Sequence, residues 1–536
     1  MKQLEVGRRH AGYYLERLRS AEELYAQGGE RLTEGLRQFD ADWGNIRAGQ
    51  AWSEKFSGQD EVAAKYCIEY PIAAPHLLTL RQHPKERIHW LEVAVALARR
   101  LGVPQAEWIT LGSLGWTYLY AGEPQHAISA LEKALPKQRV TGERKGEASV
   151  LHLLGYAYEG VGEMSRAVES FEKALMIARE MGSPSDEAQY ILSLGSAYTS
   201  LGDLNKAFEC YNKSFAISSQ IKDHRSEAAA LRRLGELYAA VGQTQQAVEY
   251  YGRVLSIDRE IGDRAGESDD LSSLGELYAR LGESEPALEY NRQSWISSRE
   301  LGDRRAESAA LGRIGSAYAQ LEDFQQAVKY FEAQLASAQE LDDRNGARDA
   351  LNNLGQAYRG LGNSGRAAQF HEQALEIARK VNNPRGESFT LNNLGLAYAD
   401  SGQTQRAIEC YEQALTINRS IGNPWGEEYN LGNLGLAYKK LGELTRAREF
   451  FERQLKVARE IGDLQGEARA LYNLSIAYSE GGERPRAIEC ADAALEIFEK
   501  LGAERQANDL RSVLAGWNKD EKRKDRPKEL PDSSHR

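Results

Sequence analysis

A repeat of forty residues is the feature that most constrains how this chain can fold. In one copy the pair Leu394-Gly395 is followed by Tyr398 and then by Ala407, and the same tyrosine and alanine positions recur in all ten copies without insertion or deletion. The equivalent pairs are Leu114-Gly115, Leu154-Gly155, Leu194-Gly195, Leu234-Gly235, Leu274-Gly275, Ile314-Gly315, Leu354-Gly355, Leu434-Gly435 and Leu474-Ser475. A unit of this size cannot bury an apolar face alone, so the copies must stack on one another.

The first half of the repeat has the spacing of an α-helix. Leu391, Leu394, Gly395 and Tyr398 fall at i, i+3, i+4 and i+7, which places all four on one stripe of a helix. A glycine at position 402 and its equivalents then supplies the positive φ that a tight helix exit needs, with Glu322 as the one exception. We call this first helix of each copy helix A.

The second half of the repeat predicts another helix. The apolar positions from Ala407 to Ile417 form a second stripe, which ends at Gly422-Asn423, a pair typical of turns. We call this helix B, so each copy is predicted to be a helical hairpin. Because Gly395 and Ala407 are small, they are predicted to be the points where helix A contacts helix B.

These motifs resemble the tetratricopeptide repeat. The pattern L-x-x-L-G-x-x-Y, followed by the alanine of helix B, extends over residues 106 to about 502. The forty-residue length and the sequence LNNLGLAY are similar to the repeats of Pins-type cell-polarity adaptors, kinesin light chains and bacterial signalling proteins. The resemblance implies an all-α fold, a right-handed α-solenoid of about ten to eleven hairpins with an atypical helical N-terminal cap.

The frame of the repeat divides the chain into five parts. We predict a helical N-terminal cap over 1–65, a degenerate repeat over 66–105 and ten repeats over 106–502. A capping helix over 503–517 and a disordered charged tail over 518–536 follow.

The segment before the repeats carries weaker signals. We expect a helix ending near residues 28–29, a second over Leu32–Phe39, a third over 43–57 and a kinked or broken helix around Pro71 and Pro75. The stretch from HAGYYLERL to HWLEVAVALARRLG resembles the helical connector of bacterial STAND-class signalling ATPases and related transcriptional regulators. The phosphate-binding motif G-x-x-x-x-G-K-[ST] of such ATPases does not occur in the sequence.

Composition excludes several classes of function. The net charge is −11 and the two signs are interspersed, which argues against a nucleic-acid surface. The sequence has no apolar run of membrane-spanning length and starts without the apolar core of a signal peptide, so we expect a cytoplasmic protein with no membrane partner. Cys210, Cys410 and Cys490 share one helix B position, where other copies have aromatic residues, so they are predicted to be buried thiols.

The sequence contains no pattern typical of a catalytic or metal site. The nine histidines follow neither the repeat nor a ligand spacing, and no G-x-S-x-G or G-x-G-x-x-G motif occurs. We therefore predict a protein that is not an enzyme, with no catalytic residues, no metal site and no cofactor.

One row of helix A positions suggests a binding surface. Asn353, Asn393, Asn433 and Asn473 occupy the same position in consecutive copies. Helices stacked about 10 Å apart would present one amide to every third residue of an extended peptide. In Pins-type adaptors and kinesin light chains the asparagine of L-x-N-L-[GA] binds peptide backbone in this way, and the resemblance implies that role here. The alternative is that these amides bond the neighbouring repeat and stabilise the stack.

Other positions of the same face have chemistry suited to a peptide. Arg233 and Arg313 are predicted to meet acidic side chains, and Phe389 and Tyr429 to supply apolar contact. We therefore expect an adaptor whose concave groove binds a peptide segment of a partner protein. The alternative is a sensor or regulatory arm of a bacterial STAND-type signalling or transcriptional regulatory system, and a third hypothesis is structural self-assembly.

Overall fold

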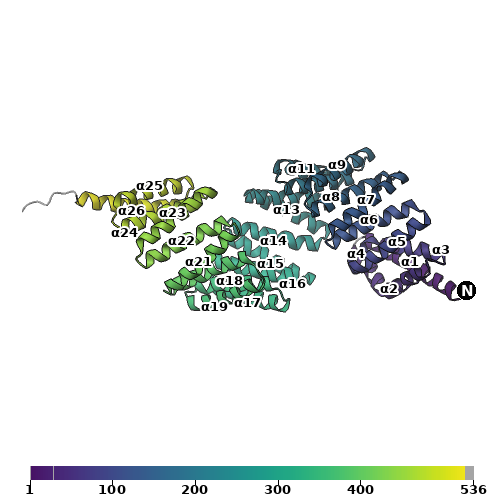
Figure 1. Cartoon of the computed structure of the whole chain (residues 1–536), viewed down its shortest axis with the longest axis horizontal. Helices are drawn as coiled ribbons and strands as arrows, with labels where there is room; N and C mark the ends of the chain where they lie inside the picture. The colour runs from purple at the N-terminus through teal and green to yellow at the C-terminus, as the bar shows by residue number, and fades with distance from the viewer. Residues whose placement is uncertain (1, 28, 525–536) are drawn as a thin grey trace, which may run out of the picture. The chain divides into compact units, whose positions relative to one another are not determined.

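The computed structural model describes residues 2–27 and 29–524, which form helices connected by short turns and contain no strand (Figure 1). The chain divides into two compact units, Met1–Asp263 and Arg264–Arg536, and each is treated by itself. The predicted all-α solenoid of hairpins is confirmed within each unit. No described helix has both the length and the apolar character needed to span a bilayer.

The first unit begins with helices outside the repeat frame. These are α1 (Lys2–Ala26), α2 (Gly29–Phe56), α3 (Glu61–Ala73), α4 (Pro75–Arg81) and α5 (Pro84–Leu101). The helices A that follow are α6 (Pro104–Tyr120), α8 (Arg144–Gly160), α10 (Pro184–Ser200) and α12 (His224–Ala240). Their helices B are α7 (Pro124–Thr141), α9 (Met164–Met181), α11 (Leu204–Ile221) and α13 (Thr244–Ile261).

The second unit continues the same alternation. Its helices A are α14 (Arg264–Arg280), α16 (Arg304–Gln320), α18 (Arg344–Gly360), α20 (Pro384–Asp400), α22 (Pro424–Lys440) and α24 (Leu464–Glu480). Its helices B are α15 (Ser284–Leu301), α17 (Phe324–Glu340), α19 (Ser364–Lys380), α21 (Thr404–Ser420), α23 (Leu444–Ile461) and α25 (Arg484–Lys500), and α26 (Glu504–Lys524) follows them.

The turns end the helices as the sequence predicts. Gly402 has φ 79°, and the next backbone N–H, that of Gln403, donates to the carbonyl oxygen of Tyr398 at 2.8 Å. At the start of the helices A α20 and α22, Asn383 and Asn423 each accept a hydrogen bond from the backbone N–H three residues further along the chain. Glu322 adopts φ 60° without being a glycine.

A close approach at the recurring glycine brings helix A against helix B. A Cβ on Gly395 would lie 2.4 Å from the ring of Tyr411, which is 2% exposed, so helix A packs directly against an aromatic ring of helix B. The predicted contact at Gly395 is thus confirmed, with Tyr411 as its partner. Ala407 is fully buried.

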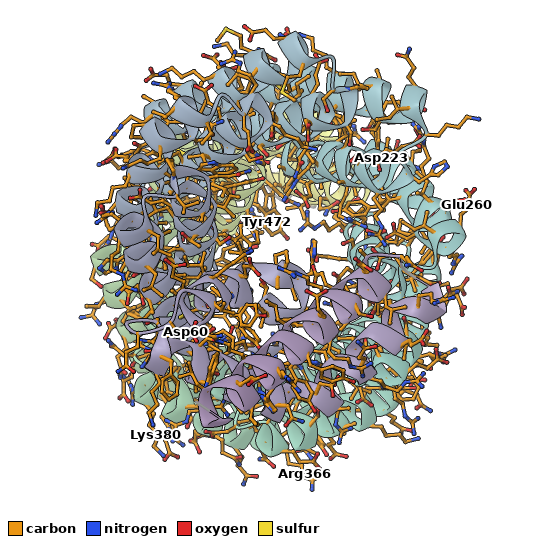
Figure 2. All side chains as sticks on the ribbon, turned by 90° about the vertical axis from the view of Figure 1, so that its right-hand side faces the viewer. Asp60, Asp223, Glu260, Arg366, Lys380 and Tyr472 are labelled. Carbon is orange, nitrogen blue, oxygen red and sulfur yellow. The ribbon has the colours of Figure 1, made fainter. Side chains whose placement is uncertain are left out.

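Helices A form the inner side of the second unit. From α14 to α24 each helix A contacts the next helix A as well as the helices B beside it, whereas successive helices B contact each other less closely. A stack of hairpins curves toward the side where its helices approach most closely. In Figure 2 Arg366 and Lys380, both on the helix B α19, point outward, and Tyr472 of the helix A α24 lies on the inner side.

Some predicted boundaries differ from the structure. The two helices expected over Leu32–Phe39 and 43–57 are one helix, α2, because Phe39 and Ile46 lie seven residues apart on one buried face. The expected break near the two prolines occurs at Ala74, between α3 and α4. Helix α26 runs past the predicted end at 517 to Lys524, and the rest of the predicted tail, 525–536, lies outside the described residues.

Candidate functional site

The inner face of the second unit carries seven of the eight residues predicted for peptide binding. Arg313 lies on α16, Asn353 on α18, Phe389 and Asn393 on α20, Tyr429 and Asn433 on α22, and Asn473 on α24. Arg233 belongs to α12 in the first unit, where its Nη1 pairs with Glu236 at 2.8 Å, and it is therefore described apart from the others.

One of the four predicted asparagines bonds a neighbouring repeat. The Nδ2 of Asn433 donates to the Oδ1 of Asn392 on α20 at 2.8 Å, and the Nδ2 of Asn430 donates to the same oxygen at 3.1 Å. These bonds tie α22 to α20. For Asn433 the structure thus favours the stacking role that the sequence left as the alternative.

The hydrogen bonds of Asn392 continue into a buried polar network. Asn430 accepts from Asn418 at 2.7 Å, and the Oδ1 of Asn418 accepts from Ser388 and from Asn423 at 2.9 Å each. The network joins helices α20, α21 and α22. Because buried amides without partners are costly, a connected set of this kind stabilises one packing of the two repeats.

The other asparagines of the row have different surroundings. Asn393 is 6% exposed, and its Nδ2 has no hydrogen-bond partner among the described residues. Asn353 lines a pocket of about 520 Å³ with Ser316, Gln320 and Arg359, whereas Asn473 is half-buried on α24. The structure therefore does not present the uniform row of free amides that the sequence predicts.

Two aromatic side chains stand out on the same face. Phe389 and Tyr429 occupy equivalent positions of α20 and α22 and are 53% and 51% exposed. Leu436 on α22 is also exposed. The guanidinium carbon of Arg469 lies 4.7 Å from the centre of the Tyr429 ring, a cation–π distance that holds this ring in place.

A buried carboxylate supports the aromatic end of the face. Glu428 is fully buried and accepts hydrogen bonds from Gln454 at 2.5 Å and from Arg469 at 3.4 Å. Burial raises the pKa of Glu428, while the two donors oppose that shift. Sequence reasoning missed this residue, although a glutamate where most other copies have alanine or serine was a visible signal.

Arg313 has few interactions of its own. It is half-buried on α16, and it forms no ion pair among the described residues. Burial lowers the pKa of Arg313, against the opposing charges of Glu276 and Asp269 on the adjacent helix A. The acidic partner that the sequence predicts for its guanidinium stays a prediction.

A second buried polar cluster was also missed. The Nδ2 of Asn352 donates to the Thr390 hydroxyl at 2.9 Å, and its Oδ1 lies 3.0 Å from the Nδ1 of His371. His371 is fully buried, with its ring against Gly355, at the position that Tyr411 occupies in the next copy. The cluster links α18, α19 and α20, and it is structural.

The part of the chain that the structure describes contains no group of three or more His, Cys, Asp or Glu side chains that could hold a metal ion. The four cysteines are free thiols, three of them buried, and burial raises the pKa of Cys410 to about 11.

Solved structures with similar repeats include signalling proteins. A STAND protein with a tetratricopeptide repeat sensor from Pyrococcus horikoshii is 17% identical, with a TM-score of 0.46, covering 70% of this chain and 53% of its own. The quorum sensor NprR from B. thuringiensis is 14% identical, with a TM-score of 0.44 and coverages of 68% and 96%. A Rap protein complexed with the competence and sporulation factor is 15% identical, with a TM-score of 0.42 and coverages of 67% and 99%. The chain thus spans about half the length of the STAND protein.

Family models place the repeats within a known family. A comparison of the sequence with curated proteins gives no significant match. Models of the tetratricopeptide repeat match residues 148–181, 186–260, 306–380, 369–420 and 428–500, together more than half of the chain. These matches fall on hairpins of both units, and the chain belongs to the tetratricopeptide repeat family.

Proposed function

We propose that this protein is a non-catalytic adaptor whose inner face in the second unit binds an extended peptide segment of a partner protein. The observation that carries the proposal is the pair of exposed aromatic rings, Phe389 and Tyr429, on adjacent helices A. Exposed apolar patches on the surface of a folded protein mark interaction sites, and aromatic side chains dominate the energy of such contacts.

Polar residues near the rings differ in whether a peptide can reach them. Asn393 is one helical turn from Phe389, but its Nδ2 is buried and has no acceptor among the described residues, so we leave it out of the proposed contact. Arg313 adds a site for an acidic side chain. Of the eight residues predicted from the sequence, we therefore propose Phe389, Tyr429 and Arg313 as peptide contacts. We assign Asn433 to stacking between repeats.

The spacing of the helices constrains the ligand. Adjacent helices pack about 10 Å apart, and three residues of polyproline II conformation span about 9 Å and return to the same side of the chain. We therefore expect a peptide with apolar side chains three residues apart. Its affinity would be on the order of micromolar, because ordering a short peptide offsets much of the contact energy.

Peptide selection on the full-length protein tests the proposal. Peptides from a display library are measured by fluorescence anisotropy against the wild type, Phe389→Ala and Tyr429→Ala, and each variant should bind at least about tenfold more weakly. The matched control is Ile296→Ala, because Ile296 is 51% exposed but lies on the helix B α15. Equal binding by Phe389→Ala and the wild type, with melting temperatures unchanged, would contradict the proposal.

The alternative function, a regulatory arm of a STAND-type signalling system, stays a prediction, as do cytoplasmic location and self-assembly.

A further inference from the structure

A pocket in the first unit lies apart from the peptide-binding face. It measures about 480 Å³ and is lined by α4, α6 and α8 together with α1 and α5. Its walls are mainly apolar and include Tyr25, Leu80, Trp108, Ile109, Trp116 and Leu153. Trp116 is 43% exposed at its mouth. Three features of this pocket depart from the repeat pattern.

The first departure is an arginine in a position reserved for alanine. Arg87 on α5 lies forty residues before Ala127, and all ten later copies have alanine there. The side chain is 2% exposed and lines the pocket. Its Nη1 donates to the carbonyl oxygen of Pro75 at 3.1 Å and to the Thr79 hydroxyl.

The charge of Arg87 has no carboxylate to balance it within the described residues. Its Nε has no hydrogen-bond partner among them. The carboxylate that influences it, Glu22, is engaged elsewhere, because it accepts from His76 and from the backbone N–H of Leu77 at the start of α4. Burial lowers the pKa of Arg87 to about 10, so the group is still charged at neutral pH. A buried cation in this state is stabilised strongly by an added anion.

The second departure is a tryptophan where seven of the nine other copies have small residues, the exceptions being Arg348 and Glu428. Trp108 on α6 is equivalent to positions occupied elsewhere by Ala148, Ala188, Ala228, Ser268, Ser308, Ser388 and Ala468. Its ring lies against Gly146, where an added Cβ would approach a ring carbon to 2.6 Å. The indole N–H of Trp108 is buried and also has no acceptor among the described residues, so a second unsatisfied donor belongs to a residue that lines the pocket.

The third departure is an unfilled space beside Gly112. At the equivalent glycines 312 and 432, an added Cβ would collide with the side chain of a helix B glutamine, Gln334 or Gln454. In the copy that contains Gly112, the residue equivalent to these glutamines is Ala134. An added Cβ on Gly112 would therefore meet nothing within 4 Å. A glycine inside a helix costs about 1 kcal/mol relative to alanine. No packing contact explains this one, and its effect is to keep the pocket open.

We propose that this pocket binds a small organic carboxylate with a flat apolar body, such as an aromatic carboxylic acid. The apolar body lies against Trp108, Trp116 and Leu153, and the carboxylate accepts from Arg87 and from the indole N–H. The proposal goes beyond the adaptor function and rests on residues of the first unit alone.

Binding of 2-naphthoate to the full-length protein tests this proposal. Titration calorimetry and tryptophan fluorescence should show saturable binding by the wild type, with the neutral 2-naphthamide binding about tenfold more weakly. Arg87→Met should remove the preference for the acid over the amide. An aromatic carboxylate occurs in small molecules and also at the C-terminus of a peptide that ends in tryptophan. Such a peptide tests the second source, and its binding without binding of free naphthoate would overturn the proposal.

A pocket-filling variant with a matched control completes the test. Gly112→Leu places a side chain in open space, so it should weaken naphthoate binding at least about tenfold without lowering the melting temperature. Gly252→Leu is the control, because Gly252 is an exposed helical glycine of the first unit with nothing within 4 Å of an added Cβ. Unchanged binding by Gly112→Leu would contradict the proposal.

Discussion

At the scale of single residues, the size of one side chain determines the size of its partner across each hairpin. The glycine of helix A meets a large side chain of helix B in most copies, as Gly155 meets Phe171 and Gly435 meets Phe451. In the last copy Ser475 replaces the glycine, and the equivalent helix B residue shrinks to Ala491. The repeat therefore conserves the filled volume and not the residue.

Gly395→Ala tests this exchange of volume. Alanine favours a helix by about 1 kcal/mol over glycine, but overpacking a buried ring costs about 1 to 3 kcal/mol. Since the added Cβ would lie 2.4 Å from the Tyr411 ring, we expect a net decrease in the free energy of unfolding, measured by urea denaturation. Gly112→Ala is the matched control and should be neutral or stabilising, because its site is open. If Gly395→Ala were as stable as the control, the tight contact between the glycine and the Tyr411 ring would not limit the size of the residue at position 395.

The buried His371 should make stability depend on pH. Burial, aided by the positive charge of Arg359, lowers its pKa to about 4, below the value of about 6.5 expected in the unfolded chain. Between these values the unfolded chain takes up a proton that the folded chain does not, so stability falls as the pH falls from 6.5 to 4. The full effect is about 3 kcal/mol.

Urea denaturation at pH 7.5 and pH 5 measures this dependence. His371→Phe, which has precedent in Phe171, Phe331 and Phe451 at the equivalent position, should reduce the loss of stability at the lower pH. Part of the loss should persist, because burial also lowers the pKa of His152 to about 4. If the difference between the two pH values were the same in wild type and variant, His371 would not be its source.

At the scale of elements, the conserved tyrosine of helix A connects helices in two ways. Where the facing helix B position is small, the phenol donates to a glutamate of the preceding helix B. These pairs are Tyr118–Glu92, Tyr158–Glu132, Tyr198–Glu172, Tyr398–Glu372 and Tyr478–Glu452. Where that position is aromatic, the rings lie close together within the hairpin, as in Tyr238–Tyr250, Tyr278–Tyr290, Tyr318–Tyr330, Tyr358–Phe370 and Tyr438–Phe450. The cysteines at this position therefore belong to the first arrangement.

Removing one hydroxyl distinguishes the two arrangements. Tyr398→Phe should lower the free energy of unfolding by about 1 kcal/mol, because it removes a hydrogen bond to a charged group between repeats. Tyr278→Phe should change stability less, because its ring stacks on Tyr290 at 5.3 Å and is retained. Chemical denaturation of both variants provides the comparison, and a larger loss for Tyr278→Phe would contradict this division of roles.

The helices of the repeats were predictable from the sequence because the same apolar and glycine pattern occurs ten times. The hydrogen-bond partners of individual side chains were not predictable. The glycines, caps and apolar stripes specify each hairpin locally, and so the register was correct throughout. The row of asparagines looked uniform in sequence, but Asn433 bonds Asn392 while Asn393 does not take part in such a bond. That difference depends on residues of the neighbouring helix, such as Asn392 on α20, and a pattern along one helix does not contain it.

At the scale of the whole molecule, the two units carry different surfaces. The second has an inner face with exposed Phe389 and Tyr429, and the first has an open pocket that Arg87 lines. Sequence reasoning found the aromatic pair but missed the pocket, because α1 and α4 contribute to it from outside the repeat frame. Deviations from the repeat at Arg87 and Trp108 were the sequence signal that pointed to it.

The peptide-binding surface that we propose is the inner wall of helices A in the second unit. Photocrosslinking of a selected peptide to full-length protein with p-benzoylphenylalanine at position 436 or at position 296 tests it most directly, because both native side chains are exposed but lie on helix A and helix B respectively. We expect crosslinks from position 436 and none from position 296. Crosslinks from position 296 alone would contradict it.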